Sequence, residues 1–265
     1  MSLYKGDSSE ILKTFDSNLV DMVITSPPYD DLRNYHNSIS WGFDVFQSVA
    51  DELYRVVKDG GVVVWVVADK TDNGSETGTS FKQALYFKEI GFNIHDTMIY
   101  RKINYVPLTH NRYEQEFEYM FCFSKGKPKT FNPIKVPCKY AGTETWGNPS
   151  FYKSDADDLT PTPKTIINDT KIKGNIFAYK TGSSTDSSNY KHPAMFPLDL
   201  AKDQIISWSN PKDIVLDCFM GSGTVGVACK ELDREFIGIE IADEYFDMAR
   251  ERIDSTMVQS KLFDM

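Results

Sequence analysis

One segment in the last quarter of the sequence limits the possible folds most strongly. Residues 215–224, VLDCFMGSGT, run from an apolar stretch through two glycines into a helical pattern. Glycines at such a point tighten a strand-to-helix turn and let the backbone approach a ligand. Glu240 follows Gly221 by 19 residues, at the end of the next apolar stretch, where its carboxylate can accept hydrogen bonds from a ribose diol. The segment therefore predicts a β-α-β unit with a ligand at the carboxyl ends of its strands.

The rest of the chain continues this alternation. Apolar runs predict strands at 20–25, 62–67, 94–100, 117–123, 214–216 and 236–239, and periodic patterns predict helices at 43–58, 80–90, 198–207, 224–231 and 243–253. Continuous apolar strands are typical of parallel sheets that helices cover on both faces. The sequence therefore predicts the α/β class, with a doubly wound, mostly parallel sheet.

The middle of the chain has a different texture. From residue 127 to about 190, Pro, Gly, Ser, Thr, Asn and Lys dominate and the periodicity fades. Residues 125–191 contain eleven lysines, no arginine and six acidic residues, a net charge of +5 within a chain of net charge −9. Such a segment fits a local contact surface for nucleic acid or a solvated loop region. We therefore divide the chain into 1–126, an irregular insertion at 127–190, and 191–265.

A second candidate site is the sequence Thr25-Ser26-Pro27-Pro28-Tyr29, which directly follows a predicted buried strand. Two prolines also occur where a strand simply ends in a stiff turn, so the tetrapeptide alone leaves both interpretations open. Its place favours a site, because ligands of open α/β sheets bind at the carboxyl ends of strands. The Ser26 hydroxyl and a rigid Pro27 carbonyl can accept hydrogen bonds from an amine, and the Tyr29 ring can stack on a base.

The glycine segment alone does not decide between two kinds of ligand. Residues 221–226 also satisfy G-x-G-x-x-G with an acidic residue about 20 positions later, which is the fingerprint of dinucleotide oxidoreductases. Asp217 disfavours that class, because a carboxylate at the strand end would repel a pyrophosphate at the helix N-terminus. Only about 40 residues follow the fingerprint, too few for the remaining strands of such a domain.

Six segments in this order resemble the DNA amino-methyltransferases, the N4-cytosine/N6-adenine family, in its permuted beta-class arrangement. They are GDS at 6–8, TSPPY at 25–29, EYMFCFSK at 118–125, HPAMFP at 192–197, DCFMGSGT at 217–224 and FIGIE at 236–240. The resemblance covers almost the whole chain except about 127–174. It implies the seven-stranded sheet of S-adenosylmethionine-dependent methyltransferases, with S-adenosylmethionine as cofactor and 127–190 as the target-recognition region.

The resemblance also implies roles for individual residues. Ser26, Pro27, Pro28 and Tyr29 would be catalytic and would hold a base flipped out of the duplex. The cofactor would be bound by Asp7 at its adenine amine, by Glu240 at its ribose, by Asp217, Phe219 and Thr224 at its methionine portion, by Gly221 and Gly223 through the loop backbone, and by His192 and Phe196, which would close the pocket. Cys218 departs from the family, which usually has proline there, and this predicts a less rigid turn.

The choice of base stays open between two amines. Serine at position 26 accompanies N4 of cytosine in the resembling family, and aspartate accompanies N6 of adenine. The sequence therefore favours N4-cytosine, with N6-adenine as the alternative, because Asp30 and Asp31 follow the loop and can supply a carboxylate. Methylation of RNA or of a protein amide is disfavoured by the motif order, and a protein without catalysis is disfavoured by the intact tetrapeptide. Glu118 fits either a contact to the base or a solvent-facing strand residue.

Partners and location follow from the same features. Double-stranded DNA is the expected partner, and the resemblance leaves room for a homodimer and for a cognate restriction enzyme. The sequence shows neither a signal peptide nor a run of 18–20 apolar residues, so we expect no membrane partner and a cytoplasmic protein. The four cysteines have no metal-binding spacing, so we expect no metal.

Overall fold

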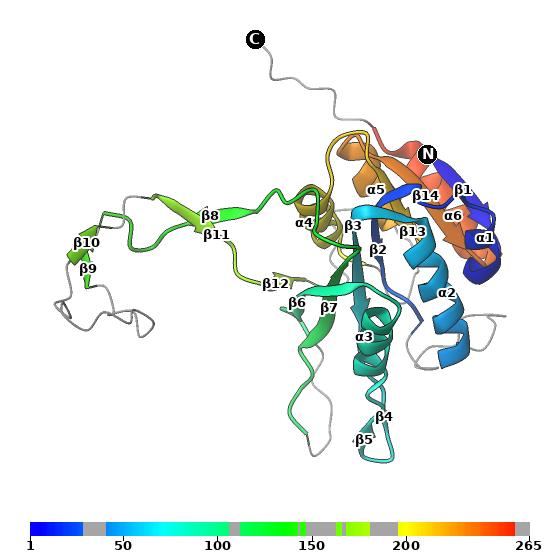
Figure 1. Ribbon diagram of the computed structural model, residues 1–265, viewed down its shortest axis with the longest axis horizontal. Helices are drawn as coiled ribbons and strands as arrows, with labels where there is room; N and C mark the ends of the chain where they lie inside the picture. The colour runs from blue at the N-terminus through cyan, green and yellow to red at the C-terminus, as the bar shows by residue number, and fades with distance from the viewer. Residues whose placement is uncertain are drawn as a thin grey trace, which may run out of the picture. The chain divides into compact units, whose positions relative to one another are not determined.

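The computed structural model of the 265-residue chain describes residues 1–28, 41–105, 112–142, 144–146, 163–165, 168–180 and 196–257 (Figure 1). Two compact units make up the chain. Unit 1 consists of Met1–Asn132 together with Asn175–Met265, and unit 2 consists of Pro133–Gly174. In the described part of the chain, no helix is long and apolar enough to cross a bilayer.

Unit 1 is built on a sheet of eight strands. Their order across the sheet is β1 (Ser2–Lys5), β14 (Glu235–Glu240), β13 (Ile214–Asp217), β2 (Val20–Thr25), β3 (Val57–Val67), β7 (Phe117–Ser124), β6 (Asn93–Lys102) and β12 (Ile176–Tyr179). Every neighbouring pair is parallel except the two pairs that include β7. The sheet is therefore mostly parallel, as the apolar strands predicted.

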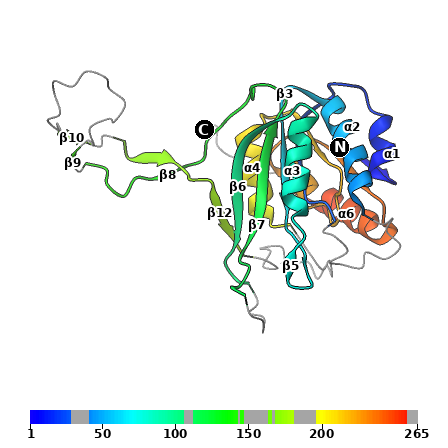
Figure 2. The same ribbon diagram turned by 60° about the horizontal axis from the view of Figure 1, so that its bottom comes forward.

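Helices cover both faces of this sheet (Figures 1 and 2). On one face, α1 (Ser8–Lys13) contacts α2 (Phe43–Val56), which contacts α3 (Thr79–Glu89). On the other face, α4 (Leu198–Trp208) contacts α5 (Thr224–Glu231), which contacts α6 (Asp243–Ser255). The predicted doubly wound α/β class is confirmed.

The central strands explain why the sheet is buried on both sides. β3 contains the run VVVWVV at 62–67, and all six side chains are buried. Trp65 lies in a cluster of aromatic rings with Phe46 and Phe87, and its indole N–H donates to Gln83 Oε1 at 2.9 Å. A buried indole needs such a partner, because an unpaired polar group in the core would cost free energy.

The order of connections makes β13 and β2 a switch point of the sheet. β13 connects to β14 through α5 on one face, whereas β2 connects to β3 through α2 on the other face. The two crossovers therefore diverge from this pair of strands. Such a switch point is where open α/β sheets bind ligands, outside the carboxyl ends of the strands.

The structure differs from the sequence prediction in the middle of the chain. The predicted irregular region, 127–190, spans all of unit 2 and also residues that belong to unit 1. Its segment Ile176–Tyr179 forms β12, which pairs in parallel with β6 and gives the sheet eight strands instead of seven. Four residues are too few to show a periodic pattern, so pairing with β6 decides their structure.

Unit 2 contains two short antiparallel ribbons. β8 (Lys135–Pro137) pairs with β11 (Thr170–Ile172), and β9 (Glu144–Trp146) pairs with β10 (Pro163–Thr165). Most side chains of β8 and all of those of β11 are exposed, including Lys135 and Lys171. A third hairpin, β4 (Thr71–Asp72) with β5 (Ser75–Glu76), belongs to unit 1.

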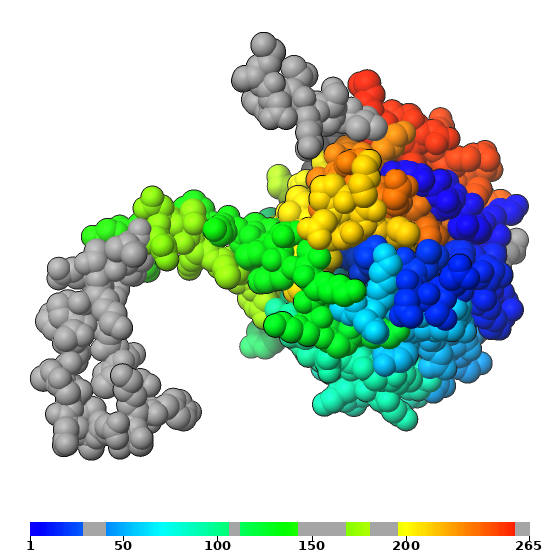
Figure 3. Space-filling view, turned by 45° about the horizontal axis from the view of Figure 1, so that its top comes forward, coloured from blue at the N-terminus to red at the C-terminus, as the bar shows by residue number. Residues whose placement is uncertain are grey.

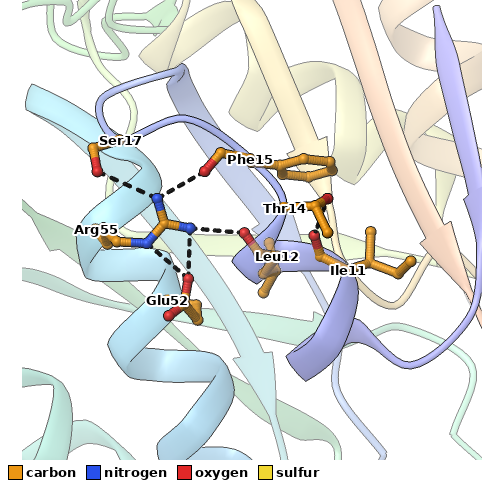
Figure 4. A network of polar contacts seen from close by, with 7 residues as sticks. All are labelled: Ile11, Leu12, Thr14, Phe15, Ser17, Glu52 and Arg55. Atoms are coloured by element: carbon orange, nitrogen blue, oxygen red, sulfur yellow. Dashed lines mark hydrogen bonds and ion pairs between the residues drawn. The ribbon is translucent and has the colours of Figure 1, made fainter.

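Arg55 of α2 holds the C-terminal end of α1 (Figure 4). Its Nη2 donates to Leu12 O at 2.8 Å and its Nη1 donates to Phe15 O at 2.7 Å, two carbonyls near the end of the short helix. Glu52, one turn earlier on α2, fixes the guanidinium through Nε and Nη2. Because Asp7 is the N-cap of α1, this contact also fixes a predicted site residue.

We expect Arg55→Met to lower the free energy of unfolding by about 2–3 kcal/mol, because carbonyls that a charged donor satisfied lose their partner. Urea unfolding followed by circular dichroism measures this change. Lys13→Ala is the control, because Lys13 lies on the exposed surface of α1, where it pairs with Glu10. Equal stabilities of the two variants would contradict the role given to Arg55.

Candidate functional site

The structure gathers most of the predicted site residues at one edge of the sheet. β1, β14, β13 and β2 are neighbours and run parallel, so their carboxyl ends lie side by side. Asp7 follows β1, Glu240 ends β14, Asp217 ends β13, and Ser26 follows β2. In Figure 3 the N-terminal residues, in blue, lie beside the C-terminal helix region, in orange and red, on the surface of this half of unit 1.

The glycine loop between β13 and α5 has the tight turn that the sequence predicted. Gly221 and Gly223 have φ angles of +51° and +79°, which other residues rarely adopt. The Gly223 N–H donates to Met220 O at 2.9 Å, and the Met220 N–H donates to Ile239 O at 2.9 Å. A Cβ on Gly223 would lie 2.8 Å from the Cβ of Ala249, so α6 leaves room only for glycine there.

Glu240 binds the same loop with its carboxylate. Its Oε2 accepts from the Gly221 N–H at 2.8 Å, and its Oε1 accepts from the Ala242 N–H at 2.8 Å. Burial raises the pKa of Glu240, and these backbone N–H groups act in the opposite direction. A carboxylate has about four acceptor positions, so it can still accept from the two hydroxyls of a ribose.

Asp217 lies at the switch point and is buried. One oxygen, Oδ1, accepts from Thr25 Oγ1 at 2.6 Å and from the Phe219 N–H at 3.1 Å. Burial raises the pKa of this carboxyl to about 7, although both hydrogen bonds lower it; the nearby charge of Glu240 adds to the increase. A cation beside Asp217 would favour the ionised form and so would be bound there.

Asp7 is joined to the same group of loops. It is the N-cap of α1, and its Oδ1 accepts from the Ser9 N–H at 2.7 Å. The preceding Gly6 N–H donates to the Glu240 carbonyl at 3.0 Å, and the Ser8 hydroxyl donates to the Cys218 carbonyl. These contacts place the Asp7 segment next to both Glu240 and the start of the glycine loop.

The proline loop, which starts with Ser26, Pro27 and Pro28, directly follows Thr25, the residue that donates the hydrogen bond to Asp217. Pro27 is buried, and Ser26 and Pro28 are half-buried. Tyr29, the last residue of the predicted catalytic tetrapeptide, lies outside the described residues. The part of the tetrapeptide that the structure describes therefore starts at the switch point between β2 and β13, where sheets of this kind bind ligands.

The remaining predicted residues are less closely tied to this edge. Phe219 is half-buried and packs edge-on against Trp41, with ring centroids 5.1 Å apart. Thr224, the first residue of α5, is buried, and its hydroxyl lies 3.4 Å from Nη1 of Arg252 on α6. Phe196 is half-buried just before α4, and His192 lies outside the described residues.

Sequence reasoning missed two partners of the site. In the sequence Thr25 stands out only as the beginning of the proline motif, yet its hydroxyl donates a hydrogen bond to Asp217. Arg252 lies 28 residues after Thr224, and no spacing rule predicts that it reaches the glycine loop. The signal that was available for Thr25 was a hydroxyl residue at the carboxyl end of a buried strand.

The acidic groups at this edge fit a ligand with cationic groups better than a dinucleotide. Two carboxylates, Asp217 and Glu240, stand at the carboxyl ends of neighbouring strands, and burial raises the pKa of both. A pyrophosphate at the N-terminus of α5 would be repelled by them, whereas an ammonium, a sulfonium and a ribose diol suit them. Among the described residues, no cluster of His, Cys, Asp and Glu could hold a metal ion.

Comparison with known proteins agrees with this chemistry. The sequence model of the family described as DNA methylase matches residues 20–251. The chain is 48% identical over 246 residues to the orphan methyltransferase M.BamHII of Bacillus amyloliquefaciens, covering 91% of each chain. It is 27% identical over 261 residues to the DNA adenine methyltransferase YhdJ of Escherichia coli K12, covering 96% of this chain and 82% of YhdJ.

Solved structures give the same result. The crystal structure of the M1.HpyAVI complex with S-adenosylmethionine superposes with a TM-score of 0.63 at 29% identity, covering 96% of this chain and 98% of that one. The dinucleotide oxidoreductase alternative is thereby excluded. The chain belongs to the DNA methylase family, the S-adenosylmethionine-dependent methyltransferases that modify N4 of cytosine or N6 of adenine in DNA.

Proposed function

We propose that the protein methylates the N4 amine of cytosine at a specific sequence in double-stranded DNA, with Ser26, Pro27, Pro28 and Tyr29 as the catalytic loop. The observation that carries this proposal is the position of Ser26. It follows Thr25, whose hydroxyl is hydrogen-bonded to Asp217, and so lies at the carboxyl end of β2, next to the switch point. In the resembling family, serine at this position accompanies N4 of cytosine and aspartate accompanies N6 of adenine, so Ser26 favours cytosine.

The chemistry explains why such a loop is needed. The exocyclic amine of a base is a poor nucleophile, because its lone pair is delocalised into the ring. Acceptors that favour a tetrahedral nitrogen make the lone pair available, and the Ser26 hydroxyl and the Pro27 carbonyl can act in this way. When bound, S-adenosylmethionine supplies an electrophilic methyl group. The base must leave the duplex to reach this position, and the Tyr29 ring would stack on it.

The neighbouring strand ends support a division of labour for the cofactor. Glu240 retains acceptor positions for the ribose hydroxyls, and Asp7, next to it, would accept from the adenine amine. Asp217 would face the ammonium of the methionine portion, because its buried carboxyl gains from a nearby cation. Phe219 and Phe196 would cover apolar parts of the cofactor, with His192 and Thr224 in the same pocket.

Residues 127–190 are the region that we assign to target recognition. The segment 125–191 carries a net charge of +5, and Lys135 and Lys171 are exposed in unit 2, with Lys173 half-buried. Such lysines would bind phosphates and make DNA affinity depend on salt. A homodimer and a cognate restriction enzyme stay predictions of the family resemblance. The 48% identical relative is called an orphan methyltransferase, which favours a chain that acts without the restriction enzyme.

The test of the target base is nucleoside mass spectrometry of DNA that the purified protein has methylated with S-adenosylmethionine. We expect N4-methylcytosine. Ser26→Ala should lose most of this product while its affinity for S-adenosylmethionine stays unchanged, because Ser26 contacts the base and not the cofactor. N6-methyladenine alone would contradict the proposal and would place the protein with its relative YhdJ.

The role of Glu240 predicts that Glu240→Ala binds S-adenosylmethionine about 10- to 150-fold more weakly, the effect of losing hydrogen bonds to a charged group. Isothermal titration calorimetry measures this affinity without DNA. Glu235→Ala is the matched control, because Glu235 begins the same strand and is exposed. If both variants bound the cofactor like the unchanged protein, the ribose contact would be wrong.

Asp217 predicts a pH dependence of cofactor binding. The pKa of Asp217 is about 7 in the free protein, so near neutral pH a fraction of the molecules carries a protonated carboxyl. In that fraction the carboxyl must lose its proton when a cation binds. We therefore expect affinity for S-adenosylmethionine to rise between pH 6 and pH 8, and to fall by at most about tenfold for each unit below the pKa. Asp217→Asn should bind weakly with a flatter profile. A profile equally steep in this variant would assign the titration to another group.

A further inference from the structure

A buried arginine from the last helix lies beneath the glycine loop. Arg252 of α6 has 4% of its surface exposed. Its Nη1 donates to the Ser222 carbonyl and to the Ser222 hydroxyl, the latter at 2.9 Å, and lies 3.4 Å from the Thr224 hydroxyl. Burying a guanidinium costs free energy that its hydrogen bonds must offset. A side chain that only filled space at this position would therefore be apolar.

These contacts explain the two hydroxyl residues of the loop sequence GSGT. Ser222 and Thr224 are both buried, and both hydroxyls lie within hydrogen-bond distance of Arg252. Gly223 stands between them with a φ of +79°, and Ala249 of α6 packs against its backbone. The two hydroxyls therefore contact α6, which leaves the backbone of the glycine loop available to a ligand.

The loop is held at consecutive residues by two different elements. Glu240, at the end of β14, accepts from the Gly221 N–H, and Arg252 donates to the carbonyl of the next residue, Ser222. α6 is itself fixed to α5, because Lys230 donates to the carbonyls of Ile253 and Asp254. The position of Arg252 relative to the loop is therefore determined by the packing of two helices.

We propose that Arg252 is a positioning residue for S-adenosylmethionine: acting through Ser222 and Thr224, it holds the glycine loop in the conformation that binds the cofactor. Arginine suits this task because one nitrogen of its charged guanidinium, Nη1, reaches oxygens of both Ser222 and Thr224, which an apolar side chain cannot do. This role of Arg252 requires that the protein uses S-adenosylmethionine, and it is the same whichever base is methylated.

The experiment compares Arg252→Met and Arg252→Lys with Arg250→Met. Arg250 is on the same helix but is exposed and pairs with Asp247, so its replacement controls for loss of a charge from α6. For each variant, calorimetry gives the Kd of S-adenosylmethionine without DNA, steady-state assays give KM and kcat, and thermal unfolding gives Tm. Conditions for the kinetic assays use saturating DNA.

We expect Arg252→Met to raise the Kd and KM of S-adenosylmethionine about tenfold or more, because contacts from a charged donor are lost. The kcat at saturating cofactor should stay nearly unchanged, since the loop binds ground state and transition state alike. Arg252→Lys should recover part of the affinity, and Arg250→Met should behave like the unchanged protein.

A second variant keeps the test decisive if Arg252→Met fails to fold. Ser222→Ala removes one acceptor and should also raise the Kd of S-adenosylmethionine, whereas combining it with Arg252→Lys should give less than the sum of the two effects. A lowered Tm with an unchanged Kd and KM in the Arg252 variants would overturn the proposal and leave Arg252 with a structural role alone. Fully additive effects of Ser222→Ala and Arg252→Lys would overturn it as well.

Discussion

One hydrogen bond, from the Thr25 hydroxyl to the Asp217 carboxyl, joins the two halves of the site. Thr25 ends β2, from which the chain crosses to one face of the sheet, and Asp217 ends β13, from which it crosses to the other. The proline loop begins one residue beyond Thr25, and the glycine loop begins just beyond Asp217. In the proposed function, the distance between a base held by the first loop and a cofactor held by the second would therefore depend on this pair.

Two of the acidic residues lie at this edge under conditions that disfavour their charge. Asp217 and Glu240 are kept where burial raises their pKa, and ionised carboxylates in such places weaken the folded state. In the proposed function, a cofactor with two positive groups would offset that cost when it binds. The segment 125–191, with a net charge of +5, carries charge of the opposite sign, which suits a polyanion. The proposed cofactor site and the proposed DNA-contacting segment therefore differ in the sign of their charge.

The sequence predicted those parts of the fold that local patterns determine. Apolar runs located β2, β3 and β13, and the glycines of 221–223 located the turn, because each signal lies within a few residues. β12 was missed, since four residues gain their structure only by pairing with β6, about 75 residues earlier. Arg252 was missed for the same reason: its acceptors lie about 30 residues away, and only the packing of α6 brings them together.

The pairing of β1 with β14 has a consequence for how the protein is made. Ser2 lies beside Ile237, so among the described residues the first strand pairs with a strand more than 230 residues later in the sequence. During synthesis the backbone groups of β1 therefore stay without their partners on β14 until almost the whole domain has left the ribosome. Contacts of such long range form slowly and leave a strand edge open to other chains. Asp7 and Glu240 therefore come together late, so the edge at which we propose that the cofactor binds is complete only once β14 is in place.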